Sequence, residues 1–438
     1  MELSSKTVKK VYFRYLSAAF GSAMISSIYG LVDMAMVGQY QGPDGTAALA
    51  VVAPVWNLMY SLGLLMGIGG SVLFGTARGR GGKREKEFFS AAVWGTVALA
   101  VFCWIAVVCF ERPMLVWFGA DEQLLVLAQE YLEPIKIVVP LFLGNQMLAA
   151  FLRNDGAPGL ATAAVLSGGI FNVVGDYLFV FAWDKGVWGA GLATALGAAI
   201  TFTVMLTHFF SRHNTLRMVK VSEMRKTIGK ISVAGFSTFF SDVAMGILTM
   251  LFNRQIMKYA GTDALAVYGI IVNISTIVQC CGYSVGQAAQ PILSFSFGAK
   301  KWTLIRKTFR YAIGTAVVFG ILWTAAAFIF PIGFVHIFMT PTSGVLKIAP
   351  SIIRCYGVSF LLLPLNVFST YYFQAIMKPN IAFVVSTGRG ALVSGCLIQI
   401  LPILWGASAL WWAMPITEFV VAVFVLWKMM FCAKEFST

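Results

Sequence analysis

Long apolar runs separated by short polar segments dominate the chain. A helix needs about 20 residues to cross a bilayer, and these runs are long enough to do so. The pattern predicts six membrane-spanning helices, a polar linker at 211–230, and six more spans. The spans are expected at 14–38, 45–75, 88–110, 127–152, 159–182, 187–210, 231–257, 262–290, 308–331, 348–377, 381–403 and 408–431.

Composition agrees with this pattern. Hydrophobic residues make up 59% of the chain, charged residues only 11%, and the mean hydropathy is +0.81. Soluble domains carry about 25% charged residues, so a polytopic membrane protein is indicated. The seven cysteines lie in apolar runs without the spacing of a disulfide framework or a metal site. We therefore expect an all-α polytopic membrane protein with twelve transmembrane helices.

The net charge of +14 has an uneven distribution. Most Lys and Arg residues fall in alternate loops, including the linker, whereas the opposite loops hold only Arg112, Lys185, Lys258 and Lys347. Cytoplasmic loops carry the excess of positive charge in membrane proteins. We expect a multi-pass protein of the cytoplasmic (inner) membrane with both termini cytoplasmic. This asymmetry explains the basic charge without a nucleic-acid partner.

The chain also contains an internal repeat. The sequence GTAALAV at 45–51 opens the second predicted span, and GTDALAV at 261–267 opens the eighth; each span is followed by a basic loop. Six spans in each half predict two pseudo-symmetric six-helix lobes in parallel orientation, at 1–210 and 231–438. The alternating charges of the cytoplasmic linker 211–230 favour a surface helix between them. Two lobes with a cleft would suit alternating access.

One apolar run holds an unusual polar pair. Asn172 and Asp176 lie inside the fifth span and share one face of a helix, because they are four residues apart. An aspartate in the middle of a span costs about 2.5–3.5 kcal/mol on insertion scales. The pair is either a polar bridge between helices or part of a site for a hard cation or a proton.

The second half has buried polar candidates of its own. Asp242 and Glu418 are acids within spans, and Gln287 and Asn366 are polar residues that could line a cleft. Arg254, Arg354 and Arg389 could pair with the acids as structural bridges, and a role in transport is the alternative. In the first half, Glu133 and Lys136 are three residues apart on span 4 and are expected to pair locally.

Several short motifs follow one another in a characteristic order and spacing. They are Ser27-Ile28-Tyr29-Gly30-Leu31-Val32-Asp33, the two GTxALAV openings, Gln290-Pro291, Arg153-Asn154-Asp155-Gly156-Ala157-Pro158 and Asn172-x-x-x-Asp176-Tyr177. Together these motifs resemble the multidrug and toxic compound extrusion (MATE) family over essentially the whole chain, and within it the DinF-like branch.

The resemblance implies a cation or proton site in the first lobe. The family's positions match Asp33 on span 1, Asn172 and Asp176 on span 5, and Thr194 on span 6. Two carboxylates, an amide oxygen and a hydroxyl could replace much of the hydration shell of Na+, and the same carboxylates could hold a proton instead. The chain departs from the family on span 4, where the usual asparagine position is apolar, and Asn145, one turn away, could take its place.

The resemblance also implies the function. We expect an antiporter, coupled to Na+ or H+, that exports amphiphilic or cationic organic compounds and is not an enzyme. Its partners would be small organic substrates and membrane lipids, it would be monomeric, and no cofactor is expected besides the coupling ion. The main alternative is a flippase for lipid-linked oligosaccharides, for which an Arg-rich cleft and often fourteen spans are expected. A non-transporting structural or receptor-like protein is the third possibility.

Overall fold

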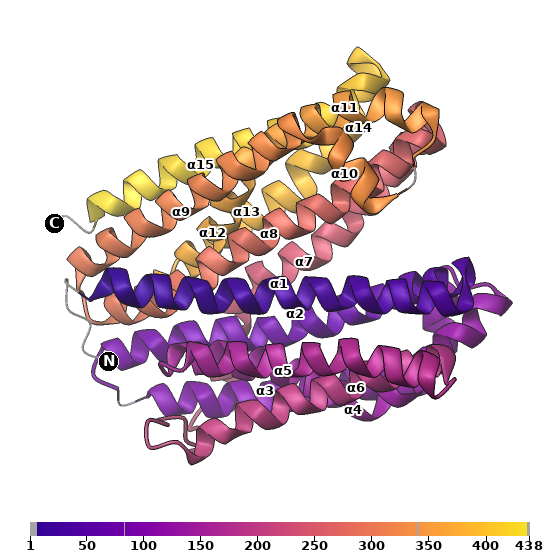
Figure 1. Cartoon of the computed structure of the whole chain (residues 1–438). Coiled ribbons are helices and arrows are strands. Elements are labelled where there is room, and N and C mark those ends of the chain that lie inside the picture. The colour runs from indigo at the N-terminus through magenta and orange to yellow at the C-terminus, as the bar shows by residue number, and fades with distance from the viewer. Residues whose placement is uncertain (1–6, 83, 340, 436–438) are drawn as a thin grey trace. The chain divides into compact units, whose positions relative to one another are not determined.

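The computed structural model describes residues 7–82, 84–339 and 341–435, and within them regular structure is helical (Figure 1). Twelve helices are long and apolar enough to cross a membrane, and they correspond one to one with the predicted spans. The predicted class, an all-α polytopic fold, is confirmed. The chain ends, which loop charge assigns to the cytoplasm, lie at 1–6 and 436–438, outside the described residues.

The first six spans use eight helical elements. Asp121 caps the fourth span by accepting from the backbone N–H of Leu124 (2.8 Å), and Pro158 stands in the first turn of the fifth. A π-helix, η1, extends the fifth span, and a 3₁₀-helix, η2, extends the sixth. The elements are α1 (Val8–Gln41), α2 (Pro43–Gly79), α3 (Glu85–Trp117), α4 (Glu122–Asn154), α5 (Pro158–Asp176), η1 (Tyr177–Ala182), α6 (Gly186–Leu206) and η2 (Thr207–Phe210).

The second six spans are more interrupted. The tenth, eleventh and twelfth spans each join α-helices to a 3₁₀- or π-helical segment, and the short helix α10 was not predicted as a separate element. The elements are α7 (Met224–Tyr259), α8 (Gly261–Gly298), α9 (Trp302–Ile329), α10 (Pro331–Phe338), α11 (Ser343–Gly357), η3 (Val358–Leu361), α12 (Leu363–Ala375), α13 (Pro379–Thr387), η4 (Gly388–Leu392), α14 (Val393–Trp405), η5 (Ala407–Trp412) and α15 (Ala413–Glu435).

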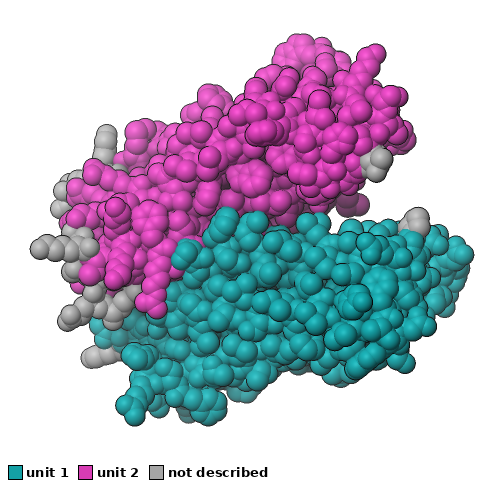
Figure 2. Space-filling view, viewed as in Figure 1, with its two compact units in different colours: residues 1, 17–239 teal, residues 2–16, 240–438 magenta. Residues whose placement is uncertain are grey.

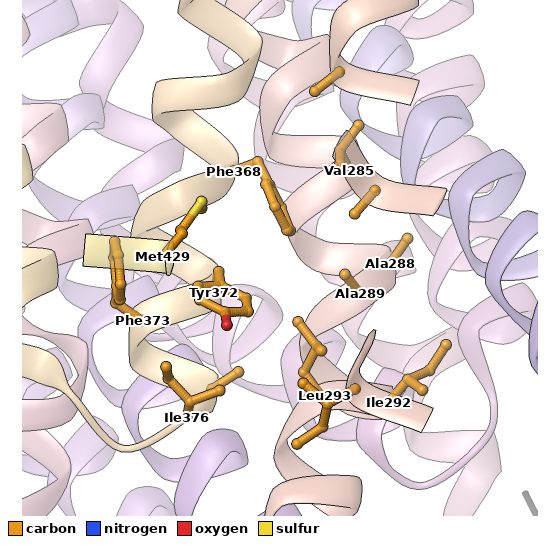
Figure 3. Close-up of a cluster of buried hydrophobic side chains, with 14 of the residues drawn as sticks. Val285, Ala288, Ala289, Ile292, Leu293, Phe368, Tyr372, Phe373, Ile376 and Met429 are labelled. Carbon is orange, nitrogen blue, oxygen red and sulfur yellow. The ribbon is translucent and has the colours of Figure 1, made fainter. Parts of the chain in front are cut away.

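The chain divides into two compact units (Figure 2). Residues 17–239 form the first unit, and residues 2–16 with 240–438 form the second, so the divisions fall within α1 and α7. The core of the second unit is apolar and lies mainly between α8 and α12, with α15 and the start of α1 (Figure 3). Its buried side chains include Val285 and Ile292 from α8, Phe368 and Tyr372 from α12, and Met429 from α15.

Small residues bring three helices of the first unit into backbone contact. A Cβ at Gly191 of α6 would overlap the carbonyl oxygen of Tyr131 on α4. A Cβ at Gly168 of α5 would overlap the carbonyl oxygen of Gly197 on α6. Without a hydrophobic driving force in lipid, such close packing is a main source of helix association. It fixes α4, α5 and α6 relative to one another, and these helices carry most of the candidate site.

The linker differs from the predicted surface helix. Residues 214–221 have no regular secondary structure, and the next helix, α7, begins at Met224. The backbone N–H groups of Thr215, Leu216 and Val219 donate to the side chains of Asp155, Asn214 and Ser90 at 2.9, 2.8 and 2.8 Å. Because these donors bond to side chains, they do not form a helical ladder. The charged residues of this segment are mostly basic, are spaced along it and are exposed.

Candidate functional site

Four residues expected from the sequence lie together in the first unit. Asp33 comes from α1, Asn172 and Asp176 from α5, and Thr194 from α6, and all four side chains are buried. Asn172 and Asp176 face the same side of α5, as their spacing requires. Asp176 is the last residue before η1. Isolated π-helical turns frequently occur at functional sites, and this one changes the helix geometry directly beside a buried carboxylate.

Hydrogen bonds connect the cluster across α1, α4, α5 and α6. The Asn172 side-chain amide donates to the Thr194 hydroxyl at 3.0 Å. Tyr131 on α4 donates its phenolic O–H to Oδ2 of Asp33 at 2.5 Å, and its oxygen is 3.5 Å from that of Thr194. Asp33 and Asp176 are close enough to interact electrostatically. The hydrogen-bonded frame thus holds the carboxylate of Asp33, and the carboxylate of Asp176 lies near it without a hydrogen bond of its own.

Four oxygens of this cluster have no hydrogen-bond donor among the described residues. They are Oδ1 of Asp33, Oδ1 of Asn172 and both carboxylate oxygens of Asp176, and all four are buried. A single buried polar group left unsatisfied costs about 1–3 kcal/mol, and a charged one costs more. Four acceptors in one place therefore suit a bound cation or a proton. This donor set is chemically appropriate for a hard cation, which prefers carboxylate and carbonyl oxygens.

Tyr131 is the member of the cluster that the sequence did not single out. It lies on α4 in a buried stripe with Pro134 and Ile135, at the i, i+3 and i+4 spacing of one helix face. A tyrosine in such a stripe has an apolar ring and a hydroxyl that needs a partner. That spacing was visible in the sequence. Its partner, however, lies on α1, far away along the chain.

Two other expectations for α4 have different outcomes. Asn145 is buried, but its amide donates to the carbonyl of Ala198, one turn of α6 beyond Thr194 (3.0 Å). The expected pair of Glu133 and Lys136 is wrong. Lys136 instead pairs with Glu111 on α3 at 2.7 Å, because Glu111 is buried and Glu133 is exposed. A buried carboxylate gains more from an ammonium group than a solvated one does.

In the second unit, Asn366 and Glu418 are brought together with Arg389. Nε of Arg389 donates to Oε1 of Glu418 at 2.6 Å, and both side chains are almost fully buried. The Asn366 amide donates to Oε2 of Glu418 at 2.6 Å and to its backbone carbonyl at 2.9 Å. Both carboxylate oxygens of Glu418 therefore have donors, so this acid forms a buried bridge with Arg389 and Asn366. Arg254 and Arg354, the other candidate bases, are exposed.

Asp242 and Gln287 occupy a different part of the second unit. Tyr283 of α8 donates to Oδ1 of Asp242 at 2.6 Å, and Gln279 donates to the Tyr283 oxygen at 2.6 Å. Gln287 is buried one turn beyond Tyr283. Among the described residues no three His, Cys, Asp or Glu side chains form a metal-binding group. The buried oxygens without donors on Asp33, Asn172 and Asp176 remain the candidate ligands for an ion.

Comparison with known proteins places this geometry in a family. The chain is 23% identical over 405 residues to the multidrug export protein MepA of Staphylococcus aureus, covering 91% of this chain and 88% of that protein. Its fold is similar to the MATE multidrug transporter DinF-BH in complex with rhodamine 6G, with a TM-score of 0.89, 23% identity, and coverage of 98% of this chain and 97% of that one. It is equally similar to a MOP superfamily transporter from Pyrococcus furiosus whose binding pocket is described as having reverse polarity, with a TM-score of 0.89, 21% identity and full coverage of both chains. The MatE family model matches residues 18–178 and 237–394, more than half of the chain, and the protein therefore belongs to the MatE family that its motifs predict.

Proposed function

We propose that this protein is a cation-coupled antiporter that exports amphiphilic or cationic organic compounds by alternating access. The observation that carries the proposal is the set of four buried oxygens without donors on Asp33, Asn172 and Asp176. Such a set is costly when empty, so an entering Na+ or H+ supplies what the protein itself does not. No nucleotide is needed, because the ion gradient provides the energy.

The cluster couples ion binding to helix position. Asn172, Asp176 and Thr194 lie on the closely packed pair α5 and α6. Asp33 lies on α1, and most residues in the apolar stretch of α1 are not buried inside the protein. An ion bridging Asp33 and Asp176 draws α1 toward α5. The ion then favours one arrangement of these helices and the substrate favours another, which is coupling through differential affinity.

Two residues position the ligands. Tyr131 holds one oxygen of Asp33, so the other oxygen remains directed to the ion. Thr194 accepts the hydrogen bond from the Asn172 amide and thereby leaves the Asn172 carbonyl oxygen available. Both contacts fix orientation before the ion arrives, which reduces the entropy lost on binding.

The charge distribution and composition of the chain bear on its orientation in the membrane and on its substrates. The protein lies in the cytoplasmic membrane with both termini cytoplasmic, because basic residues gather in one set of loops. Its abundant Met and Phe side chains, 19 and 36 in number, provide adaptable apolar walls for varied substrates. Lipid-linked oligosaccharides fit less well. Arg389, a buried arginine that could meet a pyrophosphate, is already paired with Glu418.

Efflux from proteoliposomes tests the proposal. A fluorescent organic cation such as ethidium is loaded, sodium and proton gradients are imposed separately, and wild type is compared with Asp176→Asn. We expect efflux driven by one of the two gradients, and we expect the variant to lose it. The Asp44→Asn variant is the matched control, because Asp44 is an exposed acid at the start of α2.

The outcomes separate the parts of the proposal. Sodium-driven efflux lost only in Asp176→Asn identifies a sodium antiporter, and proton-driven efflux lost in the same way identifies a proton antiporter. Efflux that persists in folded Asp176→Asn would refute the site. Absence of gradient-driven efflux in folded wild type would refute the drug-export function and direct attention to lipid-linked substrates.

Ion binding can be measured without transport. A ligand that binds only the folded state at 100 times its Kd stabilises the protein by about 2.7 kcal/mol. If the coupling ion is sodium, adding NaCl instead of KCl should therefore raise the unfolding midpoint of wild type but not of Asp176→Asn. If it is the proton, both salts should act alike.

A further inference from the structure

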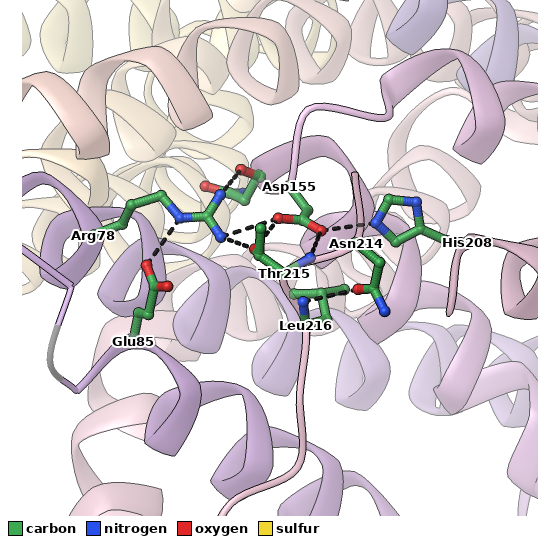
Figure 4. Close-up of polar contacts among 8 residues, drawn as sticks. Arg78, Glu85, Asp155, His208, Asn214, Thr215 and Leu216 are labelled. Atoms are coloured by element: carbon green, nitrogen blue, oxygen red, sulfur yellow. Dashed lines mark hydrogen bonds and ion pairs between the residues drawn. The ribbon is translucent and has the colours of Figure 1, made fainter. Parts of the chain in front are cut away.

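A further buried carboxylate in the first unit, that of Asp155, has a hydrogen-bond donor for each oxygen and no part in the ion site. Asp155 follows α4, and its carboxylate is completely buried. It accepts hydrogen bonds from Nη2 of Arg78 (3.0 Å), from Nε2 of His208 (2.7 Å), and from the backbone N–H (2.9 Å) and hydroxyl of Thr215 (Figure 4). Arg78 also pairs with Glu85 of α3 at 2.9 Å. We call Arg78, Glu85, Asp155, His208 and Thr215 the Asp155 cluster.

This cluster attaches the linker to the ends of the spans. Its members come from the end of α2, the start of α3, the loop after α4, the helix η2 and the linker itself. Leu216, the residue after Thr215, is buried, and Val219 donates to Ser90 of α3 at 2.8 Å. The first half of the linker is thus part of the first unit, and one of its sides is fixed against that unit.

The other side of the same segment is exposed and has a distinctive composition. Phe210 is 90% exposed and Met218 is 50% exposed. Between 210 and 230 the single acidic residue is Glu223. The exposed bases of the segment are Arg212, Arg217, Lys220, Arg225, Lys226 and Lys230.

The exposed apolar and basic side chains of this segment have the properties expected of a surface that contacts lipid headgroups. Phe210 ends the sixth span, so the segment begins at the level where a transmembrane helix leaves the bilayer. Large apolar side chains exposed to water are unfavourable, but beside lipid headgroups they find apolar surroundings. Basic segments next to transmembrane helices are attracted to acidic phospholipids in the cytoplasmic leaflet. Apolar and basic groups exposed along one segment match both features of that surface.

We propose that residues 210–226 form a docking surface for acidic phospholipid headgroups, and that the Asp155 cluster holds this surface in position. The occupant is the membrane itself, selected by charge complementarity. The Asp155 cluster prevents the linker from moving freely, so its bases meet the headgroups as a fixed group. The proposal does not depend on which ion or substrate is transported.

Lipid enrichment around the full chain tests this proposal. The protein is reconstituted in vesicles of phosphatidylglycerol and phosphatidylcholine and extracted gently, and the ratio of the two lipids that co-purify is compared with the ratio in the vesicles. We expect wild type to enrich phosphatidylglycerol about twofold or more. The triple variant Arg212→Gln, Arg217→Gln, Lys220→Gln should lose about half or more of the excess, since these side chains are three of the five bases within residues 210–226.

Three comparisons make the result specific. The matched control Lys9→Gln, Lys10→Gln, Lys300→Gln removes the same charge at exposed positions elsewhere and should keep most of the enrichment. Asp155→Asn raises the net charge, yet it should lower the enrichment because it releases the linker. Thr215→Val, which alters no charge and removes one hydroxyl donor to Asp155, should lower it less and remains informative if Asp155→Asn does not fold.

Several outcomes would overturn the proposal. Wild type without enrichment excludes the docking surface. Equal losses in the linker variant and the control variant show that net charge alone attracts the lipid. Unchanged enrichment in both Asp155→Asn and Thr215→Val shows that the Asp155 cluster does not position the linker. Enrichment that persists at 0.5 M salt, where the Debye length falls to about 4 Å, excludes headgroup attraction as its cause.

Discussion

The buried pair of Arg389 and Glu418 allows a sharp test of how the second unit is stabilised. Replacing Glu418 by Gln keeps the shape of the side chain and removes its charge. Arg389 would then stay buried with its guanidinium beside a neutral amide, since its side chain is only 7% exposed. The change creates no cavity, so the loss of stability measures the electrostatic part of the bridge.

The structure sets the expected magnitude. The Nε–Oε1 distance is 2.6 Å, and the Glu418 side chain is completely buried. Breaking such a pair from one side costs about 3–5 kcal/mol, because one charge remains buried without a partner. Replacing both charges by neutral residues is often close to neutral or even stabilising. Glu418→Gln and Arg389→Met should each destabilise by about 3–5 kcal/mol, and the double variant by much less.

A double-mutant cycle measures this coupling. Reversible unfolding in mixed micelles gives the free energy of unfolding for wild type, both single variants and the double variant. The interaction energy should exceed about 3 kcal/mol, because the double variant loses less than either single variant, and this is well above the roughly 0.3–0.5 kcal/mol scatter of independent sites. If the two single effects simply add, the side chains act through packing and the interpretation as a charge bridge is wrong.

Three further predictions concern packing and the site of the first unit. Gly235→Ala should destabilise by at least about 1–3 kcal/mol, because the added Cβ would overlap a backbone carbonyl of α2. Gly229→Ala on the same helix meets no atom and should be neutral or slightly stabilising. Thermal unfolding compares the two variants, and equal effects would contradict the contact. Tyr131→Phe should weaken coupling-ion affinity about tenfold or more, because a donor to Asp33 is lost; an unchanged midpoint in an ion titration of thermal stability would exclude this role. Lys136→Met should destabilise by about 3 kcal/mol, because it removes the positive partner of a buried acid of α3. Glu133→Gln, at an exposed position, should change the free energy of unfolding by no more than about 0.5 kcal/mol. Similar values for the two variants would argue against the observed pairing.

The spans could be predicted because lipid imposes length and apolar composition on each one separately. The ends of the spans were predicted less accurately, because the helices continue into the polar residues on either side of each apolar run. The first helix begins at Val8 instead of 14, and α2 continues to Gly79 instead of ending at 75. Polar residues at these ends keep their helical hydrogen bonds in the interfacial region, where hydropathy no longer marks the helix.

The site was predictable where chemistry is local in the chain. The shared face of Asn172 and Asp176 follows from a spacing of four residues. The meeting of these residues with Asp33 and Thr194 was expected from the family resemblance alone, and Tyr131 was missed because its partner is on α1. The partner of Lys136 was predicted wrongly for the same reason. Its spacing from Glu133 favoured a pair within one helix, but tertiary packing places the buried carboxylate of Glu111 beside it. The contacts that the sequence did not reveal are those between helices.

The glycine contact between α5 and α6 has a consequence for genetic screens of this protein. Gly168 and Gly197 tolerate no added carbon without displacing backbone, and a Cβ added at Gly197 would also lie 3.3 Å from Cβ of Asn172. If the protein exports drugs as proposed, a screen for loss of drug resistance would recover substitutions at these glycines together with those at Asn172 and Asp176. The amount of folded protein in the membrane separates the two groups: glycine variants should be depleted, whereas variants at Asn172 and Asp176 should be present and inactive.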